Sequence, residues 1–442
     1  STSSLQRLYV TTRWTGRLGN LLFGVAGLMG IASRLNAIAP TQAFTANPPT
    51  RDAVPAAQLF GQFPGLVERV RVYQSEALDV GSRISRQHRV IFEGVADPMQ
   101  VRQCRPCTWT VQEERANAFE EKKLLRLERW VANPPAGCVL GLVELHGYLQ
   151  SYKYFESIAD SLIRPAFAPA AATQKAAEAV IASARDRSGP HALLIGVQVR
   201  LGDKVRGPLA GFYASTAWSY YRRGMEYLAR HLGTPDPNGN SQPIAFIITA
   251  GGTMGDNSMD IIEAKRNLAS TITGVSSIIS FSTARDPYVD LAILRSCDGL
   301  VISSSSLGWW AAYLARLPKG HVVAPRHTIN PLLPQHHSLR RGFVPADYIP
   351  DGWLLLDNQG NGTVQGETAE EEQARMRNHL ARTGFRLEDA APQKSAGHRS
   401  GVSSVAATNM FENPVLRSAF EQARKARARR NAARARTGRR AA

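Results

Sequence analysis

The sequence predicts an α/β protein with a doubly wound parallel sheet, and two patterns carry this prediction. Short apolar runs rich in β-branched residues alternate with longer helical stretches over residues 192–324. Runs this short and this apolar are typical of strands buried on both faces, and their alternation with helices favours parallel pairing. A less regular α/β region comes before them, so the sequence predicts two Rossmann-type lobes.

In the regular region each predicted strand is followed by a predicted helix. Helices are expected over residues 213–231, 260–268, 286–296 and 307–316, and Pro287 suits the first turn of the third. The expected strands are Ala192–Val199, Pro243–Ala250, Ser276–Phe281, Leu300–Ser303 and His321–Ala324.

The first region gives weaker patterns. Strands are expected at residues 7–11 and 139–144, and helices at 20–35, 111–131 and 168–184, the last bridging the two lobes. Residues 51–106 give no assignment. The apolar stretch Leu21–Ala32 is too short to span a membrane and predicts a core helix, so no transmembrane segment is expected.

Composition places most of the positive charge at one end of the chain. The 442 residues carry a formal charge of +17, and 43% are apolar, which excludes a disordered chain. Asn413–Ala442 holds ten Lys/Arg and one acid, a net +9. The expected units are 1–165, 166–357, and a polar linker with a basic Ala/Arg-rich tail over 358–442.

The basic tail has three interpretations. It is a solvated charge run, a segment that binds RNA phosphate, or a dock for an acidic protein or an anionic lipid surface. A multi-subunit complex held through Asn413–Ala442 is the favoured partner.

The four cysteines predict neither a disulfide scaffold nor a metal site. Cys104 and Cys107 form a C-x-x-C, but Cys138 and Cys297 supply no second pair. Two neighbouring thiols in a loop are the expectation.

The strongest local motif follows the first buried strand of the regular region. An Arg200 side chain at that position suits bidentate contact with a phosphate. Gly202 permits a tight turn, and Asp203 either orients Arg200 or accepts a hydrogen bond. The alternative is an ordinary surface Arg–Asp pair.

A second motif, Ser303–Ser306, joins a strand to a helix through hydroxyl side chains. The N–H groups of a helix N-terminus and nearby hydroxyls form an anion site, whereas the alternative is a cluster of capping residues. Trp309 and Trp310 are expected to pack in the core. A third motif, Gly16–Phe23, is a glycine turn before a helix, and it lacks the spacing of a dinucleotide fingerprint.

Taken in order, these motifs resemble the α-1,2-fucosyltransferase family, glycosyltransferase family 11. The resemblance covers residues 7–357. It rests on Gly16–Phe23, Gly147–Phe155, Gln198–Asp203, the pair Tyr220-Tyr221, Asp290 with Cys297, Ser303–Leu314 and Pro350–Trp353.

The resemblance implies a GT-B-like, metal-independent transferase that moves fucose from GDP-fucose to a sugar hydroxyl with inversion; no cofactor is implied beyond this donor. Catalytic roles fall to Asp203 and Asn20. The donor-binding residues are Arg200, Gly202, Gly19, Ser304, Ser305 and Ser306.

Departures from the family pattern fall at chemical positions. Gln198 replaces a histidine, and an amide is no general base. Leu201 replaces a second arginine, and Thr249–Gly252 replaces an S-D-D segment; Ser304 and Gly308 replace an asparagine and a serine. Either the donor site is eroded or the base is relocated to Asp203.

We therefore expect a fucosyltransferase-like accessory subunit of an organellar assembly. An active α-1,2-fucosyltransferase acting on a galactoside is the alternative, and an RNA- or ribosome-associated protein is a third. The chain starts at Ser1, which suggests a processed form. The mitochondrion is the favoured compartment, and the Golgi lumen is the alternative if an anchor was removed.

Overall fold

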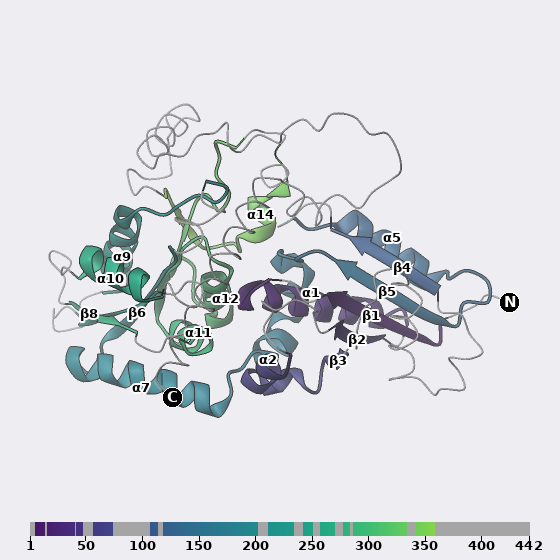
Figure 1. The fold of residues 1–442 in the computed structure, drawn as a ribbon, viewed down its shortest axis with the longest axis horizontal. Helices are drawn as coiled ribbons and strands as arrows, with labels where there is room; N and C mark the ends of the chain where they lie inside the picture. Colours follow the sequence, from purple (N-terminus) through teal and green to yellow (C-terminus); the bar gives the residue numbers. More distant parts are fainter. Residues whose placement is uncertain are drawn as a thin grey trace, which may run out of the picture.

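Two parallel β-sheets organise the chain, and helices pack around each of them (Figure 1). They are seen in a computed structural model. It describes residues 5–13, 16–39, 41–46, 56–73, 107–113, 118–201, 211–233, 242–250, 257–269, 277–282, 286–333, 337 and 342–358.

The first sheet is formed by the N-terminal part of the chain. Its strand order is β3-β2-β1-β5-β4, and every pairing is parallel. The strands are β1 (Arg7–Arg13), β2 (Thr41–Ala46), β3 (Arg71–Tyr73), β4 (Cys107–Gln112) and β5 (Leu140–His146).

The second sheet has the doubly wound order β11-β10-β9-β6-β7-β8, again parallel throughout. The chain runs outward from β6 in one direction and then from β9 in the other, so these two strands mark the switch point. The strands are β6 (Leu193–Val199), β7 (Ile244–Ala250), β8 (Ser277–Phe281), β9 (Gly299–Val301), β10 (Val322–Pro325) and β11 (Leu354–Leu356).

These sheets confirm the predicted GT-B-like α/β architecture with two Rossmann-type lobes, which are called the first and second lobe below. The boundary at residue 165 stays a prediction. The helices are α1 (Leu18–Asn36), α2 (Ala56–Gln62), α5 (Glu121–Ala132), α6 (Arg164–Ala166), α7 (Ala171–Ser188), α9 (Trp218–Leu232), α10 (Asn257–Leu268), α11 (Pro287–Arg295), α12 (Ser306–Ala315) and α14 (Pro345–Tyr348), with short turns η1 (Pro64–Leu66), η2 (Tyr152–Tyr154), η3 (Glu156–Ile158) and η4 (Ala159–Ile163).

Helix α7 extends along the second lobe and reaches the first (Figure 1). The N–H of Ala170, just before its first turn, donates to the carbonyl of Gln62 at 2.9 Å, and the Thr173 hydroxyl also bonds Gln62. This agrees with the bridging role predicted for residues 168–184.

The helix predicted over residues 111–131 is wrong at its start. Val111 and Gln112 belong to strand β4, which pairs with β5, and the helix α5 begins only at Glu121. The β-branched and aromatic side chains of Thr108–Val111 favour a strand. Their alternating exposure suits a half-buried strand at the edge of the sheet.

Helix α1 is the core helix of the first lobe. Among the described residues it is the one helix that is long and apolar enough to cross a membrane, and 83% of its most apolar stretch is buried inside the protein. Side chains are excluded where it packs most closely: a Cβ on Gly30 would collide with the carbonyl of Tyr154, and one on Gly27 would lie 2.8 Å from the Cβ of Leu149.

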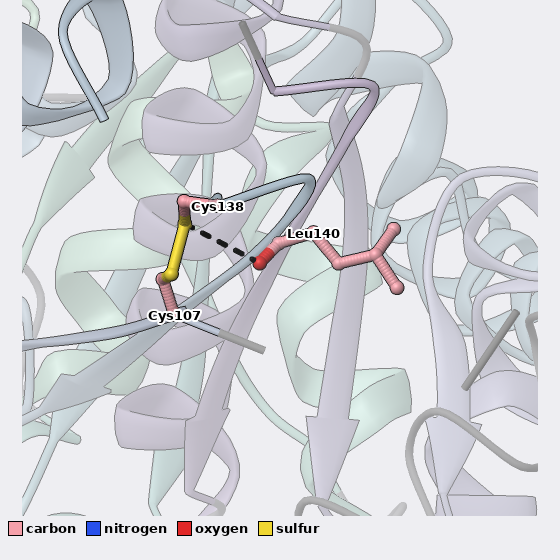
Figure 2. Close-up of a disulfide and its surroundings, with 3 residues drawn as sticks. All are labelled: Cys107, Cys138 and Leu140. Atoms are coloured by element: carbon pink, nitrogen blue, oxygen red, sulfur yellow. Dashed lines mark hydrogen bonds between the residues drawn. A yellow bond between two sulfur atoms is a disulfide. The ribbon is translucent and has the colours of Figure 1, made fainter. Parts of the chain in front are cut away.

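A disulfide joins Cys107, at the start of β4, to Cys138, just before β5 (Figure 2). The expectation of two neighbouring thiols at Cys104 and Cys107 is therefore wrong for Cys107. The parallel pairing of β4 with β5 brings the two Cα atoms to 5.9 Å, although 31 positions separate them. Cys104 lies outside the described residues, and Cys297 is a buried free thiol.

Candidate functional site

The candidate site lies where β6 and β9 end side by side at the switch point of the second sheet. Val197 pairs with Val301, so the residues that follow the two strands leave the sheet at the same edge. These are Arg200 after β6 and the serines from Ser303 after β9. Ligands of open α/β sheets bind at this edge, outside the carboxyl ends of the strands.

The N-terminus of α12 lies at this edge without a side-chain cap. Ser305 is its N-cap residue, yet the Ser305 side chain makes no capping hydrogen bond, and the first turn carries no acid. The capping alternative therefore does not describe Ser305. The neighbouring Ser304 has a structural task, since its hydroxyl donates to the carbonyls of His327 at 3.1 Å and Ala214 at 3.3 Å.

The N-terminus of α1 meets that of α12 across the two lobes (Figure 1). A Cβ on Gly19 would collide with the Ser306 hydroxyl and lie 2.7 Å from the backbone nitrogen of Leu307. The N-cap of α1, Arg17, also lacks a side-chain capping bond, and the first turn again holds no acid. The positive ends of two helix dipoles thus converge on one place, which attracts an anion.

The tryptophan pair fixes this meeting point. Trp310 donates from Nε1 to the carbonyl of Gly19 at 2.9 Å, and Trp309 donates to the carbonyl of Tyr348 at 2.7 Å. Both rings are buried and pack against Phe23 of α1, with centroids 4.4 and 5.0 Å away. The expected packing role of the pair is therefore correct.

The predicted site residues that are described gather around this junction from both lobes. Asn20 follows Gly19 in the first turn of α1, and its Oδ1 accepts a hydrogen bond from Gln150 Nε2 at 2.8 Å. Ser304, Ser305 and Ser306 lie at the start of α12, and Arg200 follows the adjacent strand. Gly202 and Asp203 lie outside the described residues.

Gln198 is buried, and its side-chain oxygen is hydrogen-bonded inside the protein. Its Oε1 accepts a hydrogen bond from the Ser303 hydroxyl at 2.5 Å and a long one from the Ser303 N–H at 3.4 Å. A Cβ at Gly308 would lie 2.8 Å from the same Oε1. The glutamine therefore occupies space that a side chain at position 308 would need.

Tyr221 extends this network toward Arg200. Its hydroxyl lies 2.7 Å from the Thr216 hydroxyl and is hydrogen-bonded to the Arg200 backbone and to Ser303. Burial raises the pKa of Tyr221 to about 12, so this phenol stays protonated near neutral pH. Its hydrogen bonds link the end of β6 to the serines before α12.

A small hollow of about 10 Å³, the size of a single water molecule, lies beside the α12 N-terminus. Hydroxyl groups of the serine run and Thr328 line one side of the hollow. Trp309, Tyr348 and the end of β10 line the apolar side. The lining residues are Ile302, Ser303, Ser304, Ser305, Trp309, Ala324, Pro325, Thr328, Tyr348 and Ile349.

The structure adds buried acids that sequence reasoning missed. Asp260 in α10 is buried, and its Oδ2 accepts a hydrogen bond from the Leu201 N–H at 3.3 Å, so it supports the chain where β6 ends. Glu113 follows β4 and accepts from the N–H groups of Tyr148 at 2.6 Å and Leu149 at 3.1 Å. An isolated acid in a polar stretch carries no sequence signal for burial, so neither was detectable.

Burial raises the pKa of Glu113 to about 7, although the two N–H bonds oppose the shift. Asp290 in α11 behaves alike: desolvation raises its pKa to about 7 against a hydrogen bond from Ser282 at 3.0 Å. Within the described ranges no group of three His, Cys, Asp or Glu side chains could hold a metal ion.

Two parallel-sheet lobes, joined where the N-terminus of α1 meets that of α12, define a GT-B-like architecture. Residues 144–330 match the model of glycosyl transferase family 11. The matched part of this chain includes the end of β6, the serine run and α12. Over these residues the chain is similar to that family, in agreement with the resemblance of its motifs.

The relatives and solved structures that it matches are distant. Galactoside alpha-(1,2)-fucosyltransferase 1 of Saimiri boliviensis boliviensis is 26% identical over 239 residues, which are 53% of this chain and 57% of the relative. The protein of the same name from Plecturocebus brunneus matches to the same extent. The chain thus spans little more than half the length of the curated relatives it matches.

Two solved structures resemble the chain only loosely. A mutant of Arabidopsis thaliana FUT1 in complex with GDP is 14% identical, with a TM-score of 0.39 over 70% of this chain and 69% of that one. A family 9 glycosyl transferase from Veillonella parvula is 11% identical, with a TM-score of 0.39 over 88% and 96%.

Proposed function

We propose that this chain binds the diphosphate of a sugar nucleotide, GDP-fucose by family resemblance, at the junction of the two lobes. One observation carries the proposal: the uncapped N-termini of α1 and α12 meet beside the switch point of the second sheet. Two positive dipole ends without an acid in either first turn leave a local field that favours a polyanion.

Arg200 is the side chain proposed to pair with this diphosphate. It follows β6, and its backbone is tied through Tyr221 to Ser303 at the start of the serine run. Ser305 and Ser306, with the first N–H groups of α12, are proposed to complete the cradle. In a transfer reaction these groups would stabilise the charge that develops on the departing diphosphate.

Titration calorimetry of the full chain with GDP and GDP-fucose tests this proposal, and UDP serves as the matched control nucleotide. We expect binding of both guanosine ligands, weaker binding of UDP, and a loss of at least about tenfold in Arg200→Ala, the scale of one charge-assisted contact. Absence of GDP binding to the wild-type chain would contradict the proposal.

A second candidate function is a non-catalytic subunit that keeps the fold. The burial and bonding of Gln198 favour it, because an amide held by Ser303 has no proton-accepting role. Transfer of radiolabelled fucose to a galactoside separates the two candidates: measurable product supports an enzyme with its base elsewhere, Asp203 being our choice, and binding without product supports the subunit.

The tail and the compartment stay proposals. Asn413–Ala442 is proposed to dock on an acidic protein, with RNA and anionic lipid as alternatives, and its deletion should release the chain from a native complex on a sizing column. The Cys107–Cys138 disulfide supports an oxidising compartment such as the Golgi lumen over the mitochondrial alternative.

A further inference from the structure

Helix α14 lies at the junction of the two lobes, next to α1 and α12 (Figure 1). On one side it is fixed to α12, because the carbonyl of Tyr348 accepts the Trp309 hydrogen bond at 2.7 Å. The Tyr348 ring stacks near Phe23 of α1, with centroids 6.0 Å apart. The short helix thus touches both elements whose N-termini form the candidate anion site.

On its other side α14 is hydrogen-bonded to the first lobe through Asp347. Oδ1 accepts from Lys153 Nζ at 2.8 Å, and Oδ2 accepts from the Phe119 N–H at 2.9 Å. The Asp347 carbonyl accepts from the Ser151 hydroxyl at 2.6 Å. Three partners from two separate segments of the first lobe therefore converge on one aspartate that lies some 200 positions later in the chain.

The burial of the Asp347 carboxylate distinguishes this cluster from a surface ion pair. The Asp347 side chain is 15% exposed and that of Lys153 is 35% exposed. Pairing with Asp347 raises the pKa of Lys153, so the lysine stays charged throughout the physiological range. Loss of the carboxylate would leave both this cation and the Phe119 N–H without their acceptor.

The same segment of the first lobe reaches the candidate site. Gln150, which directly precedes Ser151, donates to Asn20 in the first turn of α1. Phe155, two residues after Lys153, stacks on Trp310 with centroids 5.4 Å apart. A displacement of residues 151–153 would therefore be transmitted to the start of α1 and to the tryptophan that contacts Gly19.

We propose that Asp347 is a positioning residue that clasps the first lobe to α12. It thereby holds the N-termini of α1 and α12 in their observed relative position. Its clasp partners are Lys153, Ser151 and Phe119. The clasp itself is independent of any ligand. Its effect on affinity rests on the proposed sugar-nucleotide site.

Hydrogen exchange of the full chain without ligand tests the clasp directly. In Asp347→Ala we expect amide exchange in residues 18–22 and 303–309 to accelerate at least about tenfold, while β6 and β7 stay protected. Asp347→Asn retains an acceptor for the Phe119 N–H and should recover part of the protection. Unchanged exchange at both helix starts in Asp347→Ala would overturn the proposal.

Glu128→Gln is the matched control, because the Arg34–Glu128 pair has similar exposure, 35% and 23%, but joins α1 to α5 within one lobe. It should leave exchange at residues 303–309 unchanged. If Asp347→Ala does not fold, Lys153→Met provides the milder break, and unchanged exchange at both helix starts in that variant would likewise overturn the clasp.

A GDP titration of the same variants measures the consequence for the site. We expect Asp347→Ala to weaken GDP binding at least fivefold and Glu128→Gln to leave it unchanged. If wild-type chain does not bind GDP, the proposed function fails while the exchange experiment still decides on the clasp. Normal GDP affinity in an Asp347→Ala chain with accelerated exchange would overturn the positioning role.

Discussion

The Oε1 of Gln198 lies where a side chain on Gly308 would have to point, 2.8 Å from the Cβ position of that residue. By sequence, these are two separate departures from the family pattern. In the structure they are one packing solution, since the absence of a side chain at 308 leaves room for the amide that Ser303 holds. The two positions are therefore coupled through packing.

This coupling predicts a non-additive pair of substitutions. Gly308→Ala should destabilise the protein by about 1–2 kcal/mol, because overpacking outweighs the gain in helix propensity. In a Gln198→Ala background the same change should become neutral or stabilising. Urea unfolding of the four chains measures the coupling, which we expect to reach about 1–3 kcal/mol.

Gly24 of α1 offers the control for that cycle. A Cβ there would meet nothing within 4 Å, so Gly24→Ala should stabilise the helix by up to about 1 kcal/mol. Equal effects of Gly308→Ala in the two backgrounds would contradict the coupling.

Stability is predicted to fall as pH rises from about 4.5 to above 7. The pKa of Glu113 is raised from 4.5 to about 7, so the folded state holds a proton that the unfolded chain releases. The stabilisation is therefore complete below about pH 4.5 and is lost as pH passes 7, at about 3 kcal/mol per group.

The free energy of unfolding, measured by urea from pH 4.5 to 8, checks this sign. Asp290, raised from 3.8 to about 7, adds a similar slope. Glu113→Gln and Asp290→Asn should each flatten the profile, and the double variant should flatten it most. A wild-type profile that rises through this range would show that neither carboxyl is protonated in the folded protein.

The Cys107–Cys138 disulfide should appear as one cross-linked peptide in a non-reducing digest. Cys138→Ser should lower the free energy of unfolding by about 2–4 kcal/mol, because the bond closes a long loop of the unfolded chain. Reduced wild-type protein should show the same loss. A Cys107 thiol that alkylates in the native protein would rule out the bond.

Ser305→Asp should separate helix capping from anion binding. An aspartate at this N-cap position stabilises α12 by at most about 1 kcal/mol, yet its charge repels a diphosphate. We expect GDP affinity to fall at least tenfold; because Ser305 is only 6% exposed, the melting temperature is measured alongside to register the cost of burying the carboxylate.

Ala170→Asp at the N-cap of α7 is the control, since that cap also lacks a side-chain hydrogen bond. It should stabilise the chain and leave the affinity for GDP unchanged. Wild-type affinity in Ser305→Asp would place the anion elsewhere.

Most of the second lobe can be predicted from local sequence patterns. Continuous apolar runs such as those of β6 and β7 are buried on both faces, so their strand character is local and readable. The strand-end rule then placed Arg200 and the serine run at one edge. The assignment of elements failed in the first lobe, where the end of strand β4 is predicted as the start of a helix. This strand has alternating exposure and lies close in sequence to the charged helix α5.

The contacts between the two lobes depend on long-range packing. No local pattern states that Gly19 lies against Ser306, that Asp347 binds Lys153, or that Cys107 reaches Cys138. These contacts join segments tens to hundreds of residues apart, and their energies depend on burial, which a chain acquires only when both lobes are packed. The sequence therefore named candidate residues, and the packing of the two lobes brings the N-termini of α1 and α12 together beside those that the structure describes.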